Sequence, residues 1–141
     1  MRSGEIFKHE AFYRDAESGE RLPKYLVVLA RTPADDIVAR LLTSRAHGRP
    51  ESPLCFHGAP YPSFYLGVLG DPLSAKSWVD LRALDDIDAV EFGRRRTKGI
   101  ITYVTALGRE TNVQLLDCAA SADDTTRMQE KAIRDALASL H

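Results

Sequence analysis

The sequence lacks several features that would point at once to a functional class. Lys and Arg number 19 and Asp and Glu 20 among 141 residues, and this formal charge of -1 excludes the strongly basic composition of a duplex-DNA binder. No apolar run approaches the ~18 residues of a membrane span, and the N-terminus MRSGEIFKHEAF lacks the apolar core of a secretion signal. We therefore expect one domain over residues 1–141, cytoplasmic and without a membrane partner.

Cysteine is scarce, with Cys55 in PLCFH and Cys118 in LDCAA. No CxxC is present, and the four histidines are scattered without an HExxH spacing, so the sequence predicts no metal site and no cofactor. We expect two free, buried thiols in a reducing compartment. The nucleophile elbow GxSxG, the Walker phosphate loop and GxGxxG are also missing, which leaves the enzyme classes that carry them without support.

The first hundred residues instead contain short apolar runs separated by Gly, Pro and polar turn residues. Such runs predict a mainly β fold, a small barrel or sandwich, because no helix can pass through the Gly- and Pro-rich stretch 46–62. The predicted strands are GEIFKHEAFY, YLVVLA, DIVARLLT, FYLGVLG and SWVDLRAL.

The end of the chain predicts an amphipathic helix packed on the β portion. Asp123, Asp124 and Thr125 offer N-caps. Apolar residues then recur with helical spacing on one face, at Met128, Ala132, Ile133, Ala136, Leu137 and Leu140. The preceding segment, 99–120, fits a strand pair or a helix equally well.

Cationic and hydroxyl side chains stand at the ends of two neighbouring predicted strands. If YLVVLA and DIVARLLT form a hairpin, Lys24 at the start of the first lies near Thr43, Ser44 and Arg45 at the end of the second. With Arg21 in the preceding loop, this group would bind and polarise a phosphodiester. RNA carries its own nucleophile, the 2′-hydroxyl, so such a group could cleave it without a metal. The alternative is that Thr-Ser-Arg merely ends a strand and Lys24 faces solvent.

Two further features fit a nucleic-acid partner or an ordinary structural role. Trp78 and its aromatic neighbours would stack on single-stranded RNA bases or belong to the core. The basic cluster 94–98 would grip phosphates or form a solvated turn paired with the aspartates of 85–88.

In order along residues 3–90, the chain resembles the MazF/PemK toxins of type II toxin–antitoxin systems. The resemblance rests on SGEIF, the Gly-Glu pair of residues 19–20, the buried strand KYLVVL, the strand end LLTSR, and SWVDLRALDDID. It implies a small SH3-like β-barrel of the MazF/PemK/CcdB type with a C-terminal helix.

The resemblance also implies a function and roles for residues. Active members of this family are metal-independent endoribonucleases that form homodimers and are neutralised by an antitoxin. By position, Thr43 matches the catalytic threonine and Asp80 an aspartate of recognition or catalysis, while Lys24 replaces the arginine of an Arg-Pro pair. Lysine is a flexible point charge without the planar fork of arginine.

We therefore expect cleavage of single-stranded RNA through 2′-hydroxyl attack. Lys24, Thr43 and Asp80 are the expected catalytic residues. Arg21, Ser44, Arg45 and Trp78 are the expected substrate-binding residues. The alternative is a non-catalytic barrel of the same type that binds RNA or a protein or peptide partner.

Overall fold

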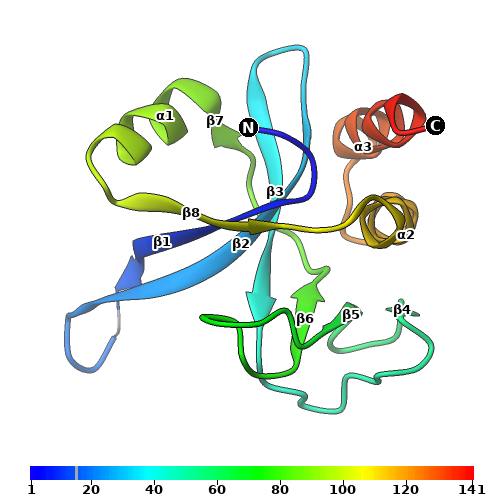
Figure 1. The fold of residues 1–141 in the computed structure, drawn as a ribbon, viewed down its shortest axis with the longest axis horizontal. Helices are drawn as coiled ribbons and strands as arrows, with labels where there is room; N and C mark the ends of the chain where they lie inside the picture. The colour runs from blue at the N-terminus through cyan, green and yellow to red at the C-terminus, as the bar shows by residue number, and fades with distance from the viewer. Residues whose placement is uncertain (15) are drawn as a thin grey trace.

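The first three apolar runs form the strands that the sequence predicts. In the computed structural model, which describes residues 1–14 and 16–141, β1 spans Glu5–Arg14, β2 spans Arg21–Arg31 and β3 spans Asp36–Thr43 (Figure 1). They pair in order as an antiparallel meander, β1 with β2 and β2 with β3. The continuous apolar character of β2 is explained by its central position, because both of its faces are covered.

Five shorter strands complete an antiparallel sheet. These are β4 (Cys55–Phe56), β5 (Ser63–Gly67), β6 (Ser77–Asp80), β7 (Ile87–Asp88) and β8 (Ile101–Ala106). Within the described residues the order is β4-β5-β6-β3-β2-β1-β8, with β7 on β3. Strand β3 joins the two halves, since its first part pairs with β2 and its last two residues pair with β6.

The sheet is not closed into the barrel that the sequence predicts. The two end strands, β4 and β8, do not pair with each other within the part of the chain that the structure describes. Helix α2 (Arg109–Ala120) follows β8 directly and packs on β4 and β5, so a helix stands between the two sheet ends (Figure 1). The mainly β class with a C-terminal helix is confirmed.

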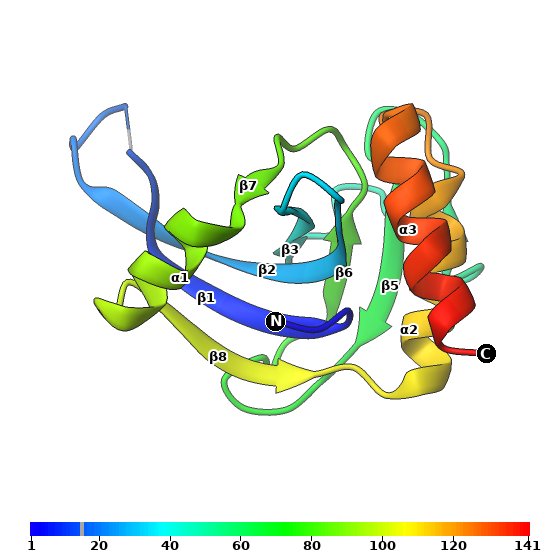
Figure 2. The same cartoon turned by 90° about the horizontal axis from the view of Figure 1, so that it is seen from above.

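Helices cover both faces of the central strands. Helix α1 (Ala89–Thr97) lies on one side of β2 and β3, and α2 with α3 (Arg127–Ser139) lies on the other (Figures 1 and 2). Each side has its own core cluster, one around Phe7 and Phe92 under α1 and one around Leu115 and Ile133 under α2 and α3. No helix in residues 1–14 and 16–141 combines the length and apolar character that crossing a membrane requires.

The C-terminal helix is confirmed, but two details of its prediction are wrong. Its N-cap is Thr126 rather than a residue of 123–125, and Thr126 forms a capping box with Gln129. Met128 is 68% exposed, whereas Ala132 and Ile133 are buried as expected. The helix is rotated so that Gln129, not Met128, faces the sheet, where it bonds to the buried Arg40.

The two cysteines are not free thiols. Cys55 in β4 and Cys118 in α2, 63 residues apart in sequence, form a disulfide. The expectation failed because each cysteine was judged by its own neighbours, while the pairing depends on α2 folding back onto β4. The segment 99–120, which the sequence left open, contains both a strand and a helix, β8 and α2.

Candidate functional site

A cleft lies where β2 begins and β3 ends, as hairpin geometry predicts. Leu26 pairs with Leu41, the last pair between the two strands, and Lys24 and Thr43 lie two residues beyond this pair on their own strands. The strand ends and the loop before β6 enclose about 440 Å³, and we name this space the strand-end cleft. Its lining residues are Tyr13, 23–25, 42–45, 72–75 and Ser77. The predicted proximity of Lys24, Thr43, Ser44 and Arg45 is therefore confirmed.

The strand-end cleft is positively charged. Within the described residues, neither Lys24 nor Arg45 takes part in an ion pair, and no carboxylate lines the cleft. The Lys24 ammonium lies 5.7 Å from the centroid of the Tyr13 ring, which is within the range of a cation–π contact. The two cations thus keep their charge available for an anion.

Hydroxyl groups in the strand-end cleft supply hydrogen-bond donors. Thr43 Oγ1 accepts the backbone N–H of Arg45 at 3.2 Å, and this leaves the Thr43 proton free to be donated elsewhere. Ser44 is exposed, and Ser74 lines the opposite wall. The hydroxyl-bearing stretch LSAKS, residues 73–77, was not predicted to line the cleft, because no local pattern places it beside β2 and β3.

Asp80, an expected catalytic residue, lies outside the strand-end cleft. Its carboxylate accepts a bond from Arg82 at 2.7 Å and lies 3.8 Å from Arg49 Nη2. Burial alone raises the pKa of Asp80, but hydrogen bonds from Arg82 and the charges of Arg82 and Arg49 outweigh it and hold this pKa below its usual value. Asp80 is therefore an ionised partner of two guanidinium groups.

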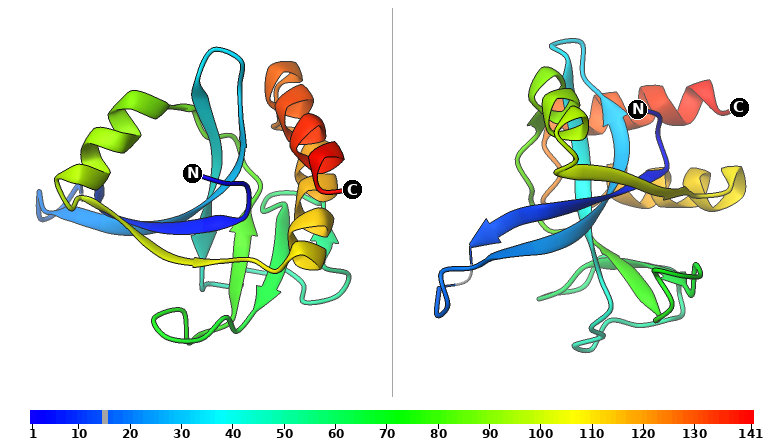
Figure 3. Two further views of the ribbon diagram at one scale, coloured as in Figure 1. Left: turned by 45° about the horizontal axis from the view of Figure 1, so that its top comes forward. Right: turned by 60° about the vertical axis from the view of Figure 1, so that its left-hand side comes forward.

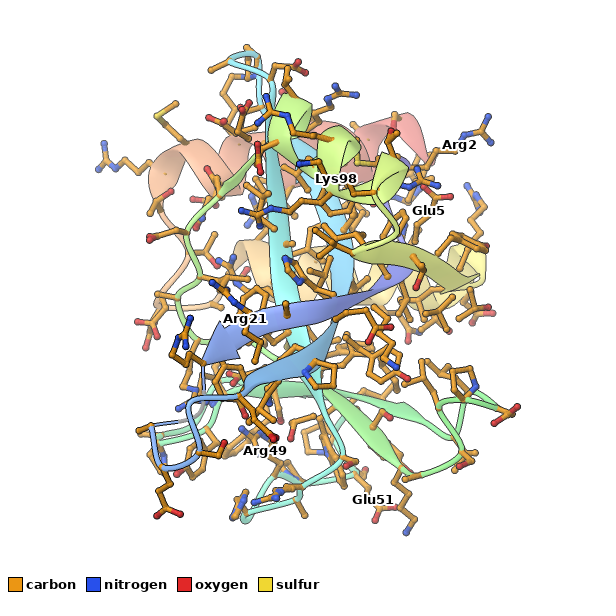
Figure 4. The ribbon with its side chains drawn as sticks, turned by 90° about the vertical axis from the view of Figure 1, so that its left-hand side faces the viewer. Arg2, Glu5, Arg21, Arg49, Glu51 and Lys98 are labelled. Carbon is orange, nitrogen blue, oxygen red and sulfur yellow. A yellow bond between two sulfur atoms is a disulfide. The ribbon has the colours of Figure 1, made fainter. Side chains whose placement is uncertain are left out.

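Arg49 links Asp80 to the strand-end cleft. Its guanidinium donates to the carbonyl of Arg45 at 2.8 Å, and it packs 4.6 Å from the centroid of the Tyr61 ring. Arg49 is 6% exposed and follows β3 on the segment below the β1–β2 hairpin (Figure 4). Asp80 therefore reaches the strand-end cleft only indirectly: it pairs with Arg49, and Arg49 donates to the backbone carbonyl of Arg45.

Trp78 and Arg21, two expected substrate-binding residues, are also placed elsewhere. Trp78 is 3% exposed, donates its indole N–H to the carbonyl of Pro50 at 2.9 Å and packs against Tyr65, so it belongs to the core. Arg21 lies at the far end of the β1–β2 hairpin, which extends beyond the rest of the sheet (Figures 3 and 4). There it lines a separate cavity with His9 and Arg95.

The basic cluster 94–98 lies in and just after helix α1, away from the strand-end cleft. Arg94 and Arg95 both pair with Glu91 within that helix, at 2.8 and 3.1 Å. Arg96 stacks 5.0 Å from the centroid of the Phe7 ring. The expected turn paired with the aspartates of 85–88 is wrong, because residues 94–97 belong to a helix in which Arg94 and Arg95 pair with Glu91.

No protein-family model, curated protein or solved structure matches the chain.

Proposed function

We propose that the strand-end cleft holds a phosphodiester of single-stranded RNA, and that the protein is a cytoplasmic, MazF/PemK-like endoribonuclease. The observation that carries this proposal is the convergence of Lys24, Thr43, Ser44 and Arg45 in one cleft whose described lining contains no carboxylate. Two cations without an ion-pair partner among residues 1–14 and 16–141, together with hydroxyl donors, suit an anion whose charge is spread over several oxygens.

The proposed reaction needs no nucleophile from the protein. The 2′-oxygen attacks phosphorus and loses its proton to water, the bond to the 5′-oxygen breaks, and that oxygen takes up a proton from water, leaving a 2′,3′-cyclic phosphate. Lys24 and Arg45 offset the charge that develops on the non-bridging oxygens, and Thr43 donates a hydrogen bond to one of them. Asp80 acts as a positioning residue, through Arg49 and the carbonyl of Arg45.

A specific observation favours the second candidate, an RNA-binding module that does not cleave. The described lining of the strand-end cleft contains neither a carboxylate nor an imidazole to accept the 2′-hydroxyl proton, and Asp80 is held by two arginines. A protein or peptide partner with an acidic segment, such as an antitoxin, would suit the same charge.

The architecture agrees with a MazF/PemK/CcdB type of fold in part. An antiparallel sheet that divides at β3 and carries a C-terminal helix supports an SH3-like relationship, with α2 as an addition that keeps the sheet open. On this proposal the protein acts as a homodimer.

The test is cleavage of a long mixed-sequence RNA by purified protein in EDTA. We expect discrete products ending in a 2′,3′-cyclic phosphate, reduced by about 10²–10³-fold in Lys24→Ala and in Thr43→Ala. The matched control is Lys98→Ala, an exposed lysine that Figure 4 shows far from Arg49, and it should leave cleavage unchanged.

Binding measured in parallel separates the two candidates. Lys24→Ala should make the negative slope of log affinity against log salt shallower by about 0.7, the value for one phosphate contact on a single strand. If the RNA binds with this dependence on salt and on Lys24 but stays intact, the protein is the non-catalytic binding module. If the folded protein shows neither cleavage nor Lys24-dependent binding, both candidates are overturned.

A further inference from the structure

Three side chains that can ligate a metal meet between β4 and α2. Cys55 belongs to β4, His57 follows it by two residues, and Cys118 lies in the last turn of α2. The Nε2 atom of His57 is 3.3 Å from the sulfur of Cys55 and 3.5 Å from the sulfur of Cys118. The local spacing Cys-Phe-His was visible in the sequence, but the third member comes from 61 residues further along.

We propose that Cys55, His57 and Cys118 form a redox-controlled zinc site, in which the disulfide is the metal-free form and the reduced pair binds Zn²⁺ together with His57. In a tetrahedral site with Zn–S of about 2.3 Å and Zn–N of about 2.05 Å, nitrogen and sulfur ligands stand about 3.6 Å apart and two sulfurs about 3.8 Å apart. The imidazole nitrogen already lies close to the first of these separations from both sulfurs. The main rearrangement is that the two sulfurs separate once their bond is reduced.

A small cavity lies beside the two cysteines. The two cysteines line about 270 Å³ of open space together with Gln114 and Asp117 from α2. A water molecule in this space, or the Asp117 carboxylate after its side chain turns toward the sulfurs, would supply the fourth ligand, and both are ordinary zinc ligands. Two cysteines, one histidine and one open position make up a ligand set that zinc is known to accept.

The chemistry balances with a dithiol reductant. The dithiol transfers two electrons and two protons, so the Cys55–Cys118 bond becomes two thiols while the dithiol becomes its own disulfide. Zinc then displaces one proton from each thiol, and the protons pass to solvent. In a reducing compartment the thiol form prevails, and the pair is then available to metal.

His57 must change its hydrogen bonding in this step. In the disulfide form, its Nε2 atom lies 2.9 Å from the carbonyl oxygen of Cys118. A carbonyl oxygen only accepts, so Nε2 carries the ring proton there. Zinc needs the Nε2 lone pair, so the proton moves to Nδ1 and the bond to the carbonyl is given up. His57 is exposed, which leaves its ring room to make this adjustment.

The test uses the full chain, reduced with dithiothreitol, desalted without oxygen and titrated with Co²⁺. We expect one Co²⁺ per chain with thiolate-to-cobalt charge-transfer absorption and the visible bands of a tetrahedral site, displaced by Zn²⁺. The air-oxidised chain should give no such spectrum. Asp117→Asn separates the two sources of the fourth ligand, since the spectrum changes if the carboxylate binds and stays if water does.

His57→Ala should weaken Co²⁺ binding at least about tenfold. The matched control is His141→Ala, another exposed histidine, which should bind as the natural chain does. A reduced chain that binds no Co²⁺, a spectrum without the thiolate band, or an unchanged affinity in His57→Ala would each overturn the proposal.

Discussion

A buried arginine and the glutamine that contacts it provide a quantitative test of how α3 is held on the sheet. Arg40 of β3 is 1% exposed, and it donates to Gln129 Oε1 at 3.0 Å and to the carbonyl of Ala39 at 2.8 Å. Within the described residues its Nε has no partner. Burial lowers the pKa of Arg40, and nearby aspartates led by Asp86 offset part of this. The charge is therefore held at a cost in desolvation.

Gln129→Ala should destabilise the fold more than Arg40→Met. Gln129 also accepts the Thr126 N–H at 3.1 Å and donates to Asp86 at 2.8 Å, so its loss weakens the capping box and leaves the guanidinium with one partner fewer. A bond to a charged group contributes about 1.5–3 kcal/mol and a cap about 1 kcal/mol, which makes the expected loss about 3 kcal/mol. Arg40→Met removes the buried charge itself and should cost about 1 kcal/mol or less.

The double variant tests whether the effects of the two substitutions depend on each other. Once Arg40 is methionine, Gln129→Ala costs little beyond the cap, so the double variant should lose about 2 kcal/mol and be more stable than Gln129→Ala alone. The assay is urea unfolding followed by circular dichroism, with the disulfide intact. Glu130→Ala, which breaks only an exposed ion pair to Arg134 in the same helix, is the control and should change the free energy of unfolding by under about 0.5 kcal/mol. The reasoning is refuted if the losses in free energy of unfolding of the two single variants simply add in the double variant. It is also refuted if Arg40→Met loses more than Gln129→Ala.

Two further predictions concern Asp80 and the disulfide. The pKa of Asp80 is lowered in the folded state, so its stabilisation is complete above its ordinary value near 3.8 and is lost as the pH falls below that. Asp80→Asn should therefore lower stability at neutral pH and flatten the acid side of the unfolding profile, and an unchanged profile would contradict this. Removing the Cys55–Cys118 bond by reduction in EDTA should lower the free energy of unfolding by up to about 4 kcal/mol, from the loop entropy of a 63-residue separation. An unchanged urea midpoint on reduction would contradict it.

Local pattern was enough to predict the central strands and the four cleft residues Lys24, Thr43, Ser44 and Arg45. The run DIVARLLT coincides with β3, Asp36–Thr43, because eight residues rich in β-branched and leucine side chains have few alternatives between turn signals. Lys24 and Thr43 line the same cleft because antiparallel pairing brings the start of β2 to the end of β3. Their roles toward RNA stay a prediction.

Features that depend on distant segments were not predictable in this way. Helix α1 is short and contains Gly93, which weakens its helical propensity, and it packs on the sheet through Phe92, whose ring lies edge-on to Phe7 at 5.1 Å. The open sheet depends on α2 standing between its ends, and the Cys55–Cys118 pair depends on the same helix. Each is a tertiary contact between elements that no short window of sequence contains.

Residues 43–45 of the strand-end cleft and Cys55 of the disulfide lie on one continuous segment, so a change at the disulfide has a direct route toward the cleft. Arg49 lies between them and is held by Asp80 at 3.8 Å and by the carbonyl of Arg45 at 2.8 Å. Because Arg49 is buried and held by two contacts, local unfolding that begins at the disulfide should stay on the β4 side of Arg49. We therefore expect reduction of the disulfide to speed amide hydrogen exchange around Cys55 while leaving residues 43–46 unchanged.

In Asp80→Asn the anchor loses its charge partner, so reduction should speed exchange in both segments. The prediction is independent of any RNA activity, because the readout is amide exchange in the isolated chain. Faster exchange at 43–46 on reduction of the natural chain would show that Arg49 does not separate the two sites. The cleft would then open together with the disulfide, and metal binding at Cys55, His57 and Cys118 would have a route to control it.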